Sequence, residues 1–136
     1  MDSTLDGSDI GLMATTIWGE ARGEPLIGKV AVAYVILTRA KRGGWYGNTI
    51  KEVIMKPYQF SAWNRNDPNF AKMSMTTMAD NAYRDCMYAT LGAVQKHLPN
   101  LAEGATHYHT LRMRPYWIKD MRNIATIGNH IFYEEG

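Results

Sequence analysis

An almost uninterrupted apolar segment restricts the fold of this chain more than any other feature. Pro25 suits the first turn of a helix, and the residues that follow are apolar on nearly every side until Lys41, Arg42 and the pair Gly43–Gly44. The apolar residues are Val30, Ala31, Val32, Ala33, Val35, Ile36 and Leu37. Because a helix without a polar face must be covered on all sides, we predict that it lies at the centre of the domain.

An amphipathic helix precedes this segment and carries the acidic residue of greatest interest, Glu20. We expect the helix to begin at Ser8 or Asp9 and to end near Arg22, with Glu20 in its last turn. Its apolar stripe consists of Ile10, Met13, Ala14, Ile17 and Ala21. Apolar neighbours and the negative end of the helix dipole both disfavour a carboxylate, so we predict a raised pKa, which suits a general acid. The alternative is an ordinary ion pair with Arg22 or Lys29.

Two more helices are expected in the middle of the chain. Thr49 and Glu52 form a capping box ahead of a short helix that ends at Pro57. A second helix is predicted from Thr76 to about His97, with residues 64–75 as a loop before it. Its stripe consists of Met78, Ala82, Cys86, Ala89 and Ala93, and the four methionines from Met73 to Met87 are interpreted as core residues.

In the last third of the chain the helical spacing gives way to alternation. Residues 105–110 alternate as a strand, and residues 124–127 and 130–133 flank a Gly128–Asn129 turn as a hairpin. We therefore predict an α+β fold that is mainly helical with a small antiparallel sheet. A length of 136 residues fits one domain, residues 1–136.

Composition excludes several classes of function. The formal net charge of +2 is too small to indicate nucleic-acid binding, and no apolar run approaches the roughly 20 residues of a membrane-spanning helix. The lone Cys86 excludes a disulfide framework, and we expect it in the core. The first ten residues, MDSTLDGSDI, are acidic and polar, so we expect synthesis in the cytoplasm without a signal peptide.

Basic residues crowd the middle of the chain. They are Arg39, Lys41, Arg42, Lys51, Lys56 and Arg65. A basic face of this kind would attract an anionic polymer, although such charges are more often no more than a solvated surface.

Two segments have the composition of a carbohydrate subsite, where aromatic faces stack on sugars and polar groups form hydrogen bonds. One is residues 58–63, YQFSAW, in which Gln59, Ser61 and Trp63 are candidate substrate-binding residues. The other is the pair Trp45–Tyr46 in a glycine-rich loop. The alternative for both is that the aromatic side chains cover the core.

Four blocks together resemble a known family: WGEARGEP, GKVAVAYVILTR, QFSAW and IGNHIFY. In content, order and spacing they are similar to the cell-wall hydrolase family of the spore cortex-lytic enzyme SleB, over nearly the whole chain. The resemblance implies a lysozyme-like domain that cleaves peptidoglycan, without metal or cofactor, and makes the first Glu of GEARGE, here Glu20, the catalytic acid. It also implies that the segment with His107, Tyr108 and His109 lines the substrate site, although the spore enzymes have aromatic residues where this chain has histidines.

The resemblance and the polar N-terminus together suggest a phage endolysin. We expect a monomer that acts on peptidoglycan glycan strands in the periplasm and inserts into no membrane, with a separate holin for its release.

The histidines leave a zinc enzyme as an alternative. His107 and His109 share one face of the expected strand, and His130 on the hairpin would complete a three-histidine site for an amidase or endopeptidase. No HExxH motif supports it. A wall-binding module that leaves Glu20 idle is the alternative outside the enzymes.

The expected reaction follows from the number of carboxylates. We expect Glu20 to protonate the glycosidic oxygen between N-acetylmuramic acid and N-acetylglucosamine. Asp67 is interpreted as a turn residue, and Glu24 as structural, either capping the second helix or pairing with an arginine. Without a second acid, Glu20 can return as a base and take the proton of the sugar's own 6-hydroxyl, so we predict a lytic transglycosylase, with a hydrolysing muramidase as the alternative.

Overall fold

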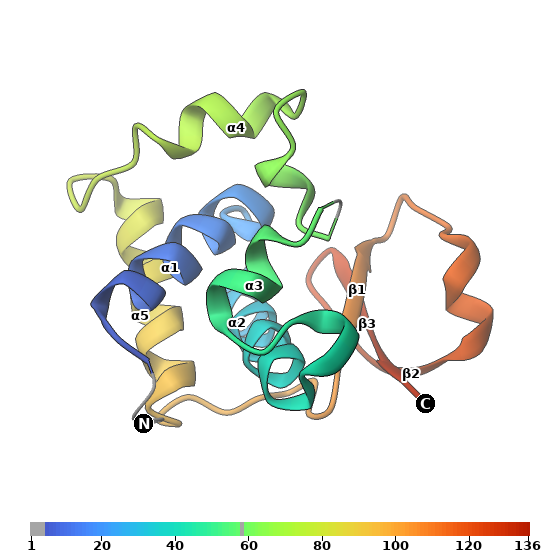
Figure 1. Ribbon diagram of the computed structural model, residues 1–136. Helices are drawn as coiled ribbons and strands as arrows, with labels where there is room; N and C mark the ends of the chain where they lie inside the picture. Colours follow the sequence, from blue (N-terminus) through green and yellow to red (C-terminus); the bar gives the residue numbers. More distant parts are fainter. Residues whose placement is uncertain (1–4, 58) are drawn as a thin grey trace.

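The structure is a computed structural model that describes residues 5–57 and 59–136. It confirms a mainly helical α+β fold with a small antiparallel sheet, set to one side of the helices (Figure 1). The α-helices are α1 (Gly7–Ala21), α2 (Leu26–Arg42), α3 (Ile50–Met55), α4 (Pro68–Met73) and α5 (Asn81–Val94). The short 3-10 helices are η1 (Gly44–Tyr46), η2 (Ser61–Trp63) and η3 (Tyr116–Asp120), and the strands are β1 (His107–Thr110), β2 (Met121–Ile127) and β3 (His130–Glu135).

Residues 1–4 and Tyr58 lie outside the described residues. The expectations for the N-terminal segment and for an aromatic platform at Tyr58 fall on these residues and stay predictions. Release by a separate holin likewise stays a prediction. Within the described ranges, no helix is both long and apolar enough to cross a membrane.

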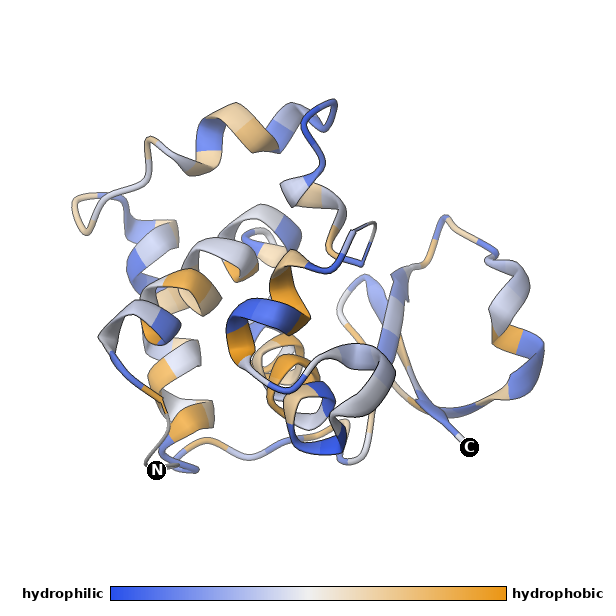
Figure 2. Cartoon of the chain, in the orientation of Figure 1, coloured by the Kyte–Doolittle hydropathy of each residue, from blue (hydrophilic) through white to orange (hydrophobic). Residues whose placement is uncertain are grey.

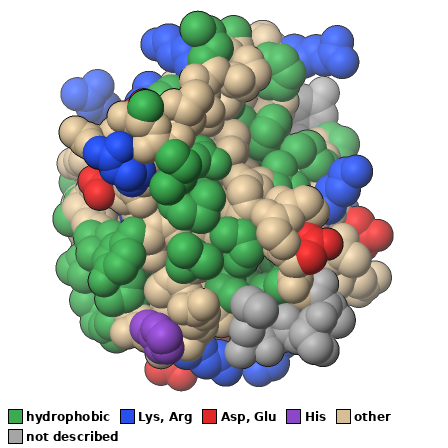
Figure 3. All heavy atoms as spheres, turned by 90° about the vertical axis from the view of Figure 1, so that its left-hand side faces the viewer, with side chains coloured by type: hydrophobic (Ala, Val, Ile, Leu, Met, Phe, Trp, Pro, Cys, Tyr) green, Lys and Arg blue, Asp and Glu red, His purple; other side chains and the backbone are tan. Residues whose placement is uncertain are grey.

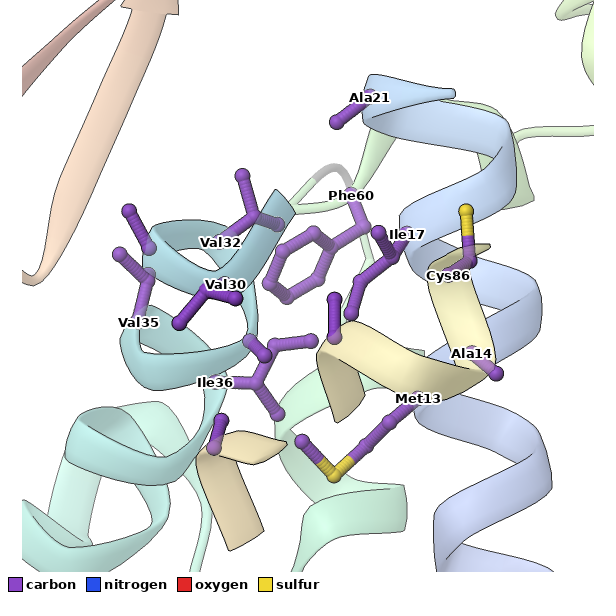
Figure 4. Close-up of a cluster of buried hydrophobic side chains, with 14 of the residues drawn as sticks. Met13, Ala14, Ile17, Ala21, Val30, Val32, Val35, Ile36, Phe60 and Cys86 are labelled. Carbon is purple, nitrogen blue, oxygen red and sulfur yellow. The ribbon is translucent and has the colours of Figure 1, made fainter. Parts of the chain in front are cut away.

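Helix α2 occupies the centre of the helical layer, as predicted from its apolar sequence. It packs against α1, α3 and α5, and hydrophobic residues gather where these helices meet (Figure 2). Val32 and Ile36 of α2 face Ile17 of α1, with the ring of Phe60 between the two helices (Figure 4). Cys86 lies in the same core, where burial raises the pKa of its thiol to about 12, so it is a packing residue.

The first helix begins earlier than predicted. Asp6, not Ser8 or Asp9, is its N-cap: its carboxylate accepts from the Asp9 amide at 3.0 Å, while the Asp9 carboxylate accepts from the Asp6 amide at 3.1 Å. Asp9 is thus the other half of the capping box. At the other end α1 stops at Ala21, and Pro25 is the N-cap of α2 rather than a residue of its first turn.

Residues 68–73 form α4, so the prediction of an unbroken loop there is wrong. Asp67 and Pro68 are the N-cap and first residue of this helix. Helix α5 begins only at Asn81, because Asp80 caps it with bonds to two backbone amides. Met78, the first residue of the predicted stripe, therefore lies outside the helix, and the prediction is wrong for it. Met75 and Met78 are exposed rather than buried. Hydrophobic side chains also gather on the surface of the face shown in Figure 3.

The three strands pair in the order β1–β3–β2, all antiparallel, and the predicted hairpin at Gly128–Asn129 is confirmed. Thr110 pairs with His130, and Tyr108 pairs with Phe132. His130 therefore shares the face of Tyr108, whereas His107 and His109 lie on the other face. The three-histidine zinc site is excluded by this register, and no other metal-binding group of His, Cys, Asp and Glu occurs among the described residues.

Candidate active site

Glu20 lies in the last turn of α1, and two distant segments hold its carboxylate. The amide of Ala62, in η2, donates to Oε2 at 2.9 Å, and the Ser61 hydroxyl lies 3.5 Å from the same oxygen. The hydroxyl of Tyr108, in β1, donates to Oε1 at 2.8 Å. The structure thus brings together Glu20, Ser61 and Tyr108 from three parts of the chain.

The surroundings of Glu20 favour its protonated form. Burial raises the pKa of the carboxyl group, and the nearby charge of Asp67 raises it further. The hydrogen bonds from Ala62, Tyr108 and Ser61 act in the opposite direction, because they stabilise the carboxylate. The net effect is a raised pKa, as predicted from the sequence. The same hydrogen-bond donors can stabilise the Glu20 carboxylate once the proton has left.

Segment 59–63 can reach Glu20 because it lies directly against α1. A methyl group at Gly19 would lie 2.8 Å from the Ala62 Cβ and 2.6 Å from the Met73 sulfur, so only glycine allows this approach. The Trp63 indole nitrogen donates to the Thr16 hydroxyl at 2.9 Å. Trp63 therefore anchors the segment on α1. Gln59, on the other side of Ser61, is partly exposed.

Tyr108 lies on the inner face of β1, toward the helices. Its ring packs against His130, with centroids 4.9 Å apart, and against Phe132 at 5.6 Å. Burial raises the pKa of the Tyr108 hydroxyl well above its usual value, and the neighbouring Glu20 adds to this. The hydroxyl therefore stays a hydrogen-bond donor at any pH at which an enzyme works.

His107 and His109 do not join this group. The His109 Nε2 accepts from the Tyr133 hydroxyl at 2.9 Å, and its Nδ1 donates to the Thr110 carbonyl at 2.7 Å. The His107 ring lies 5.2 Å from the Trp117 ring, and burial lowers the pKa of His107 to about 4. Both belong to a small aromatic cluster between the sheet and η3.

Glu24 is structural, although not in either way predicted. Its Oε1 accepts from the Asn129 amide at 2.8 Å, and its Oε2 accepts from the Asn129 side chain at 3.3 Å. Among the residues that the structure describes, it neither caps α2 nor pairs with an arginine. Instead it fastens the β2–β3 turn to the junction of α1 and α2. Asp67 likewise has a local role, since it caps α4 by accepting from the Asn69 amide at 2.8 Å.

Sequence reasoning missed two groups near Glu20. One is the Ala62 amide, which no side-chain pattern can reveal. The other is Arg39, which was assigned to a basic surface but is only 5% exposed. The sequence did contain a signal for its burial. Residue 39 follows Val35 by four positions and Ile36 by three, so it lies on the same buried face of the helix.

The two aromatic candidates of the glycine-rich loop, Trp45 and Tyr46, differ in exposure. Trp45 is 63% exposed and Lys56 lies 4.4 Å from its ring centroid, whereas Tyr46 is buried. Of this pair, Trp45 is therefore the residue that can stack on a sugar.

The chain is similar to proteins of one kind. Residues 23–133 match the family model described as Cell Wall Hydrolase, a match that begins just after Glu20. The spore cortex-lytic enzyme of Halalkalibacterium halodurans is 36% identical over 126 residues, which cover 92% of this chain and 34% of that protein. The spore cortex-lytic enzyme of Bacillus subtilis is 31% identical over 134 residues, or 98% of this chain and 40% of that protein. The chain thus spans well under half the length of these relatives.

The fold has a close counterpart among solved structures. The catalytic domain of the germination-specific lytic transglycosylase SleB from Bacillus anthracis superimposes with a TM-score of 0.77 and 30% sequence identity. The superposition covers 98% of this chain and 100% of that domain.

Proposed function

Because the chain belongs to the cell wall hydrolase family, we propose that it is a peptidoglycan-cleaving lytic transglycosylase with Glu20 as its general acid and base. The observation that carries the proposal is the environment of Glu20, a carboxyl group with a raised pKa and with donors at both oxygens. A general acid needs the first property, and the anion left after proton transfer needs the second. We propose that residues 1–136 act as a single catalytic domain and as a monomer.

In the first step, protonated Glu20 gives its proton to the oxygen between C1 of N-acetylmuramic acid and its N-acetylglucosamine neighbour. The C1–oxygen bond breaks, the leaving sugar keeps the proton, and C1 becomes oxocarbenium-like. Glu20 is now a carboxylate. The Ala62 amide and the Tyr108 hydroxyl hydrogen-bond to it without having to move.

In the second step, the Glu20 carboxylate takes the proton of the 6-hydroxyl of the same muramic acid residue. The 6-oxygen attacks C1 and closes a 1,6-anhydro ring, so no water is consumed and Glu20 regains its proton. The assignments of the other carboxylates support this ending. Glu24 is occupied by Asn129 and Asp67 by the start of α4. Asp67 is the nearer candidate for a base in a hydrolysing mechanism, since its charge acts on Glu20.

Substrate contacts are proposed for the residues next to Glu20. The exposed Ser61 and the partly exposed Gln59 present a hydroxyl and an amide to a sugar, and Tyr108 orients Glu20. For His107, His109 and Trp63 we propose supporting roles, because their hydrogen bonds and ring contacts are made within the protein.

The experiment is digestion of purified peptidoglycan sacculi in water enriched in heavy oxygen. The wild type should clear the suspension and release muropeptides that are one water lighter than hydrolysed ones and carry no label. Glu20→Gln, which keeps the shape but cannot donate the proton, should lower the rate by a factor of about 10² to 10⁴.

Labelled reducing ends would show a muramidase, and binding without clearing would show a wall-binding module. Activity lost with EDTA and restored by zinc would revive a metal-dependent amidase or endopeptidase.

A further inference from the structure

Arg39 is a buried cation that contacts the two segments that hold Glu20. It extends from α2, its side chain is almost inaccessible to solvent, and its Nε donates to the Thr106 carbonyl at 2.7 Å. The centre of its guanidinium lies 5.1 Å from the ring centroid of Phe60 and 5.6 Å from that of Tyr46. Among the described residues no carboxylate forms a salt bridge with it.

Two of these contacts, with Phe60 and with Thr106, are made next to the residues that bind the Glu20 carboxylate. Phe60 is followed at once by Ser61 and Ala62, whose amide donates to Oε2. Thr106 lies two residues before Tyr108, whose hydroxyl donates to Oε1. The guanidinium of Arg39 therefore joins segment 60–62, which binds Oε2 of Glu20, to strand β1, which binds Oε1.

We propose that Arg39 is the positioning residue of the site: it fixes segment 60–62 and strand β1 at the separation that Glu20 requires, and its charge stabilises the carboxylate that remains after proton transfer. The inference rests on the proposed role of Glu20 and adds a second, indirect participant to it. Arg39 itself touches neither the substrate nor the reacting atoms.

The positive charge of Arg39 points to a role beyond packing, because a neutral side chain could join the two segments without the penalty of burying a cation. Burying a cation without a salt-bridged partner is unfavourable, and burial lowers the pKa of Arg39 accordingly. The groups that act on Arg39 from the surrounding elements are Tyr108, Tyr46, Glu20 and Glu135, and all of them favour its charged form. Asp67 acts on Glu20 from the side of α4, in the opposite sense to a cation. Attraction between Arg39 and an ionised Glu20 stabilises both charges, so on Glu20 it acts against the effects of burial and of Asp67.

The test is a carbon-13 NMR titration of the Glu20 carboxyl, assigned with Glu20→Gln, together with kinetics on sacculi. Arg39→Met keeps most of the side-chain length without the charge, and Arg39→Lys keeps the charge but cannot contact both segments. The control is Arg42→Met, which removes the same charge three residues further along α2, where Arg42 is exposed and pairs with Glu134 at 3.0 Å.

In Arg39→Met the pKa of Glu20 should rise by about one unit or more, and kcat should fall about 10- to 100-fold with little change in the half-saturating amount of sacculi. Arg39→Lys should keep the pKa of Glu20 near the wild-type value but still lose kcat, and Arg42→Met should resemble the wild type in both. A Glu20 titration in Arg39→Met that matches the wild type overturns the proposal.

If Arg39→Met does not fold, Arg39→Lys decides alone: lower kcat supports the positioning role, and wild-type kcat overturns it. Failure of the wild type to clear sacculi would overturn the proposed function instead, and the titration would still measure the effect of Arg39 on Glu20.

Discussion

The Tyr108 hydroxyl lies 2.8 Å from Glu20 Oε1, although 88 residues separate the two in the sequence. Glu20 belongs to the helical layer and Tyr108 to the sheet, so the acid is complete only when the sheet is docked on the helices. Further links help to fix that docking, among them those from Glu24 to Asn129, from Arg39 to the Thr106 carbonyl and from Arg42 to Glu134. Catalysis should therefore be sensitive to changes that leave Glu20 itself intact.

Tyr108→Phe removes one donor to Glu20 and keeps the ring contacts with His130 and Phe132. A hydrogen bond to a charged group contributes about 1.5 to 3 kcal/mol, so kcat on sacculi should fall about 10- to 100-fold while the protein stays folded. The matched control is Tyr133→Phe on the neighbouring strand, whose hydroxyl binds His109 on the other face of the sheet. Equal activity of both variants and the wild type would remove Tyr108 from the site.

Gly19→Ala tests whether the approach of η2 to α1 matters for Glu20. The new methyl group would meet Ala62 and Met73 at distances that force them to move, so the Ala62 amide should lose its bond to Glu20. Both activity and the unfolding midpoint in urea should fall. Gly11→Ala in the same helix has open space around the new methyl group and should raise stability by about 0.5 to 1 kcal/mol with unchanged activity. Full activity in Gly19→Ala would mean that η2 tolerates displacement.

Local patterns in the sequence carry most of the secondary structure. Helix α2 follows from an apolar surface on all sides, and the hairpin follows from alternating residues around Gly128, whose φ of 58° is the left-handed conformation such a turn requires. Helix α4 was missed because Asp67–Pro68 starts a turn and a helix equally well. Its six residues are too few to show a helical period.

The site is only half visible in the sequence. Glu20 stands out because its helix, its burial and its motif are all local features. Its partners are not local: the Ala62 amide carries no residue-type signal, and whether β1 turns Tyr108 or His107 toward Glu20 depends on strand register. The same register decides that His130 joins Tyr108 rather than the other histidines, which a one-residue shift would reverse.

Glu24 offers a test of the docking of the hairpin. Glu24→Gln keeps an oxygen for the Asn129 amide, so we expect much of the activity to remain. Glu24→Ala leaves that amide without its partner and should lower the free energy of unfolding by about 1 to 3 kcal/mol, as measured by urea denaturation. Activity of the folded Ala variant should fall as well, since the turn also positions the sheet that carries Tyr108. A Gln variant as inactive as Glu20→Gln would instead make Glu24 the second acid.

His107 should make the protein less stable in acid. Burial lowers the pKa of His107 from an ordinary 6.5 to about 4, so the unfolded chain binds a proton that the folded protein does not. Stability from this source is complete above pH 6.5 and is lost as the pH falls toward 4. His107→Phe keeps an aromatic ring beside Trp117 without a titrating group, so its unfolding midpoint should fall less steeply over this range. Part of the slope should persist, because burial also lowers the pKa of His130. Identical slopes would assign the acid sensitivity elsewhere.

Glu20 should act on stability in the opposite direction. Burial raises its pKa above the ordinary value of 4.5, so the folded protein holds the proton more tightly than the unfolded chain does. The wild type therefore loses stability as the pH rises from 4.5 through the raised pKa, whereas Glu20→Gln, which stays neutral, does not. The difference in unfolding free energy between the two should be small at pH 4, should grow in favour of Gln as the pH rises, and should then level off. The pH at which that growth levels off, from urea denaturation at a series of pH values, reports the folded-state pKa without any substrate. It should coincide with the pH at which activity on sacculi falls on the alkaline side. A difference that is the same at every pH would mean that Glu20 ionises as freely in the folded protein as in the unfolded one, and the general-acid assignment would lose its physical basis.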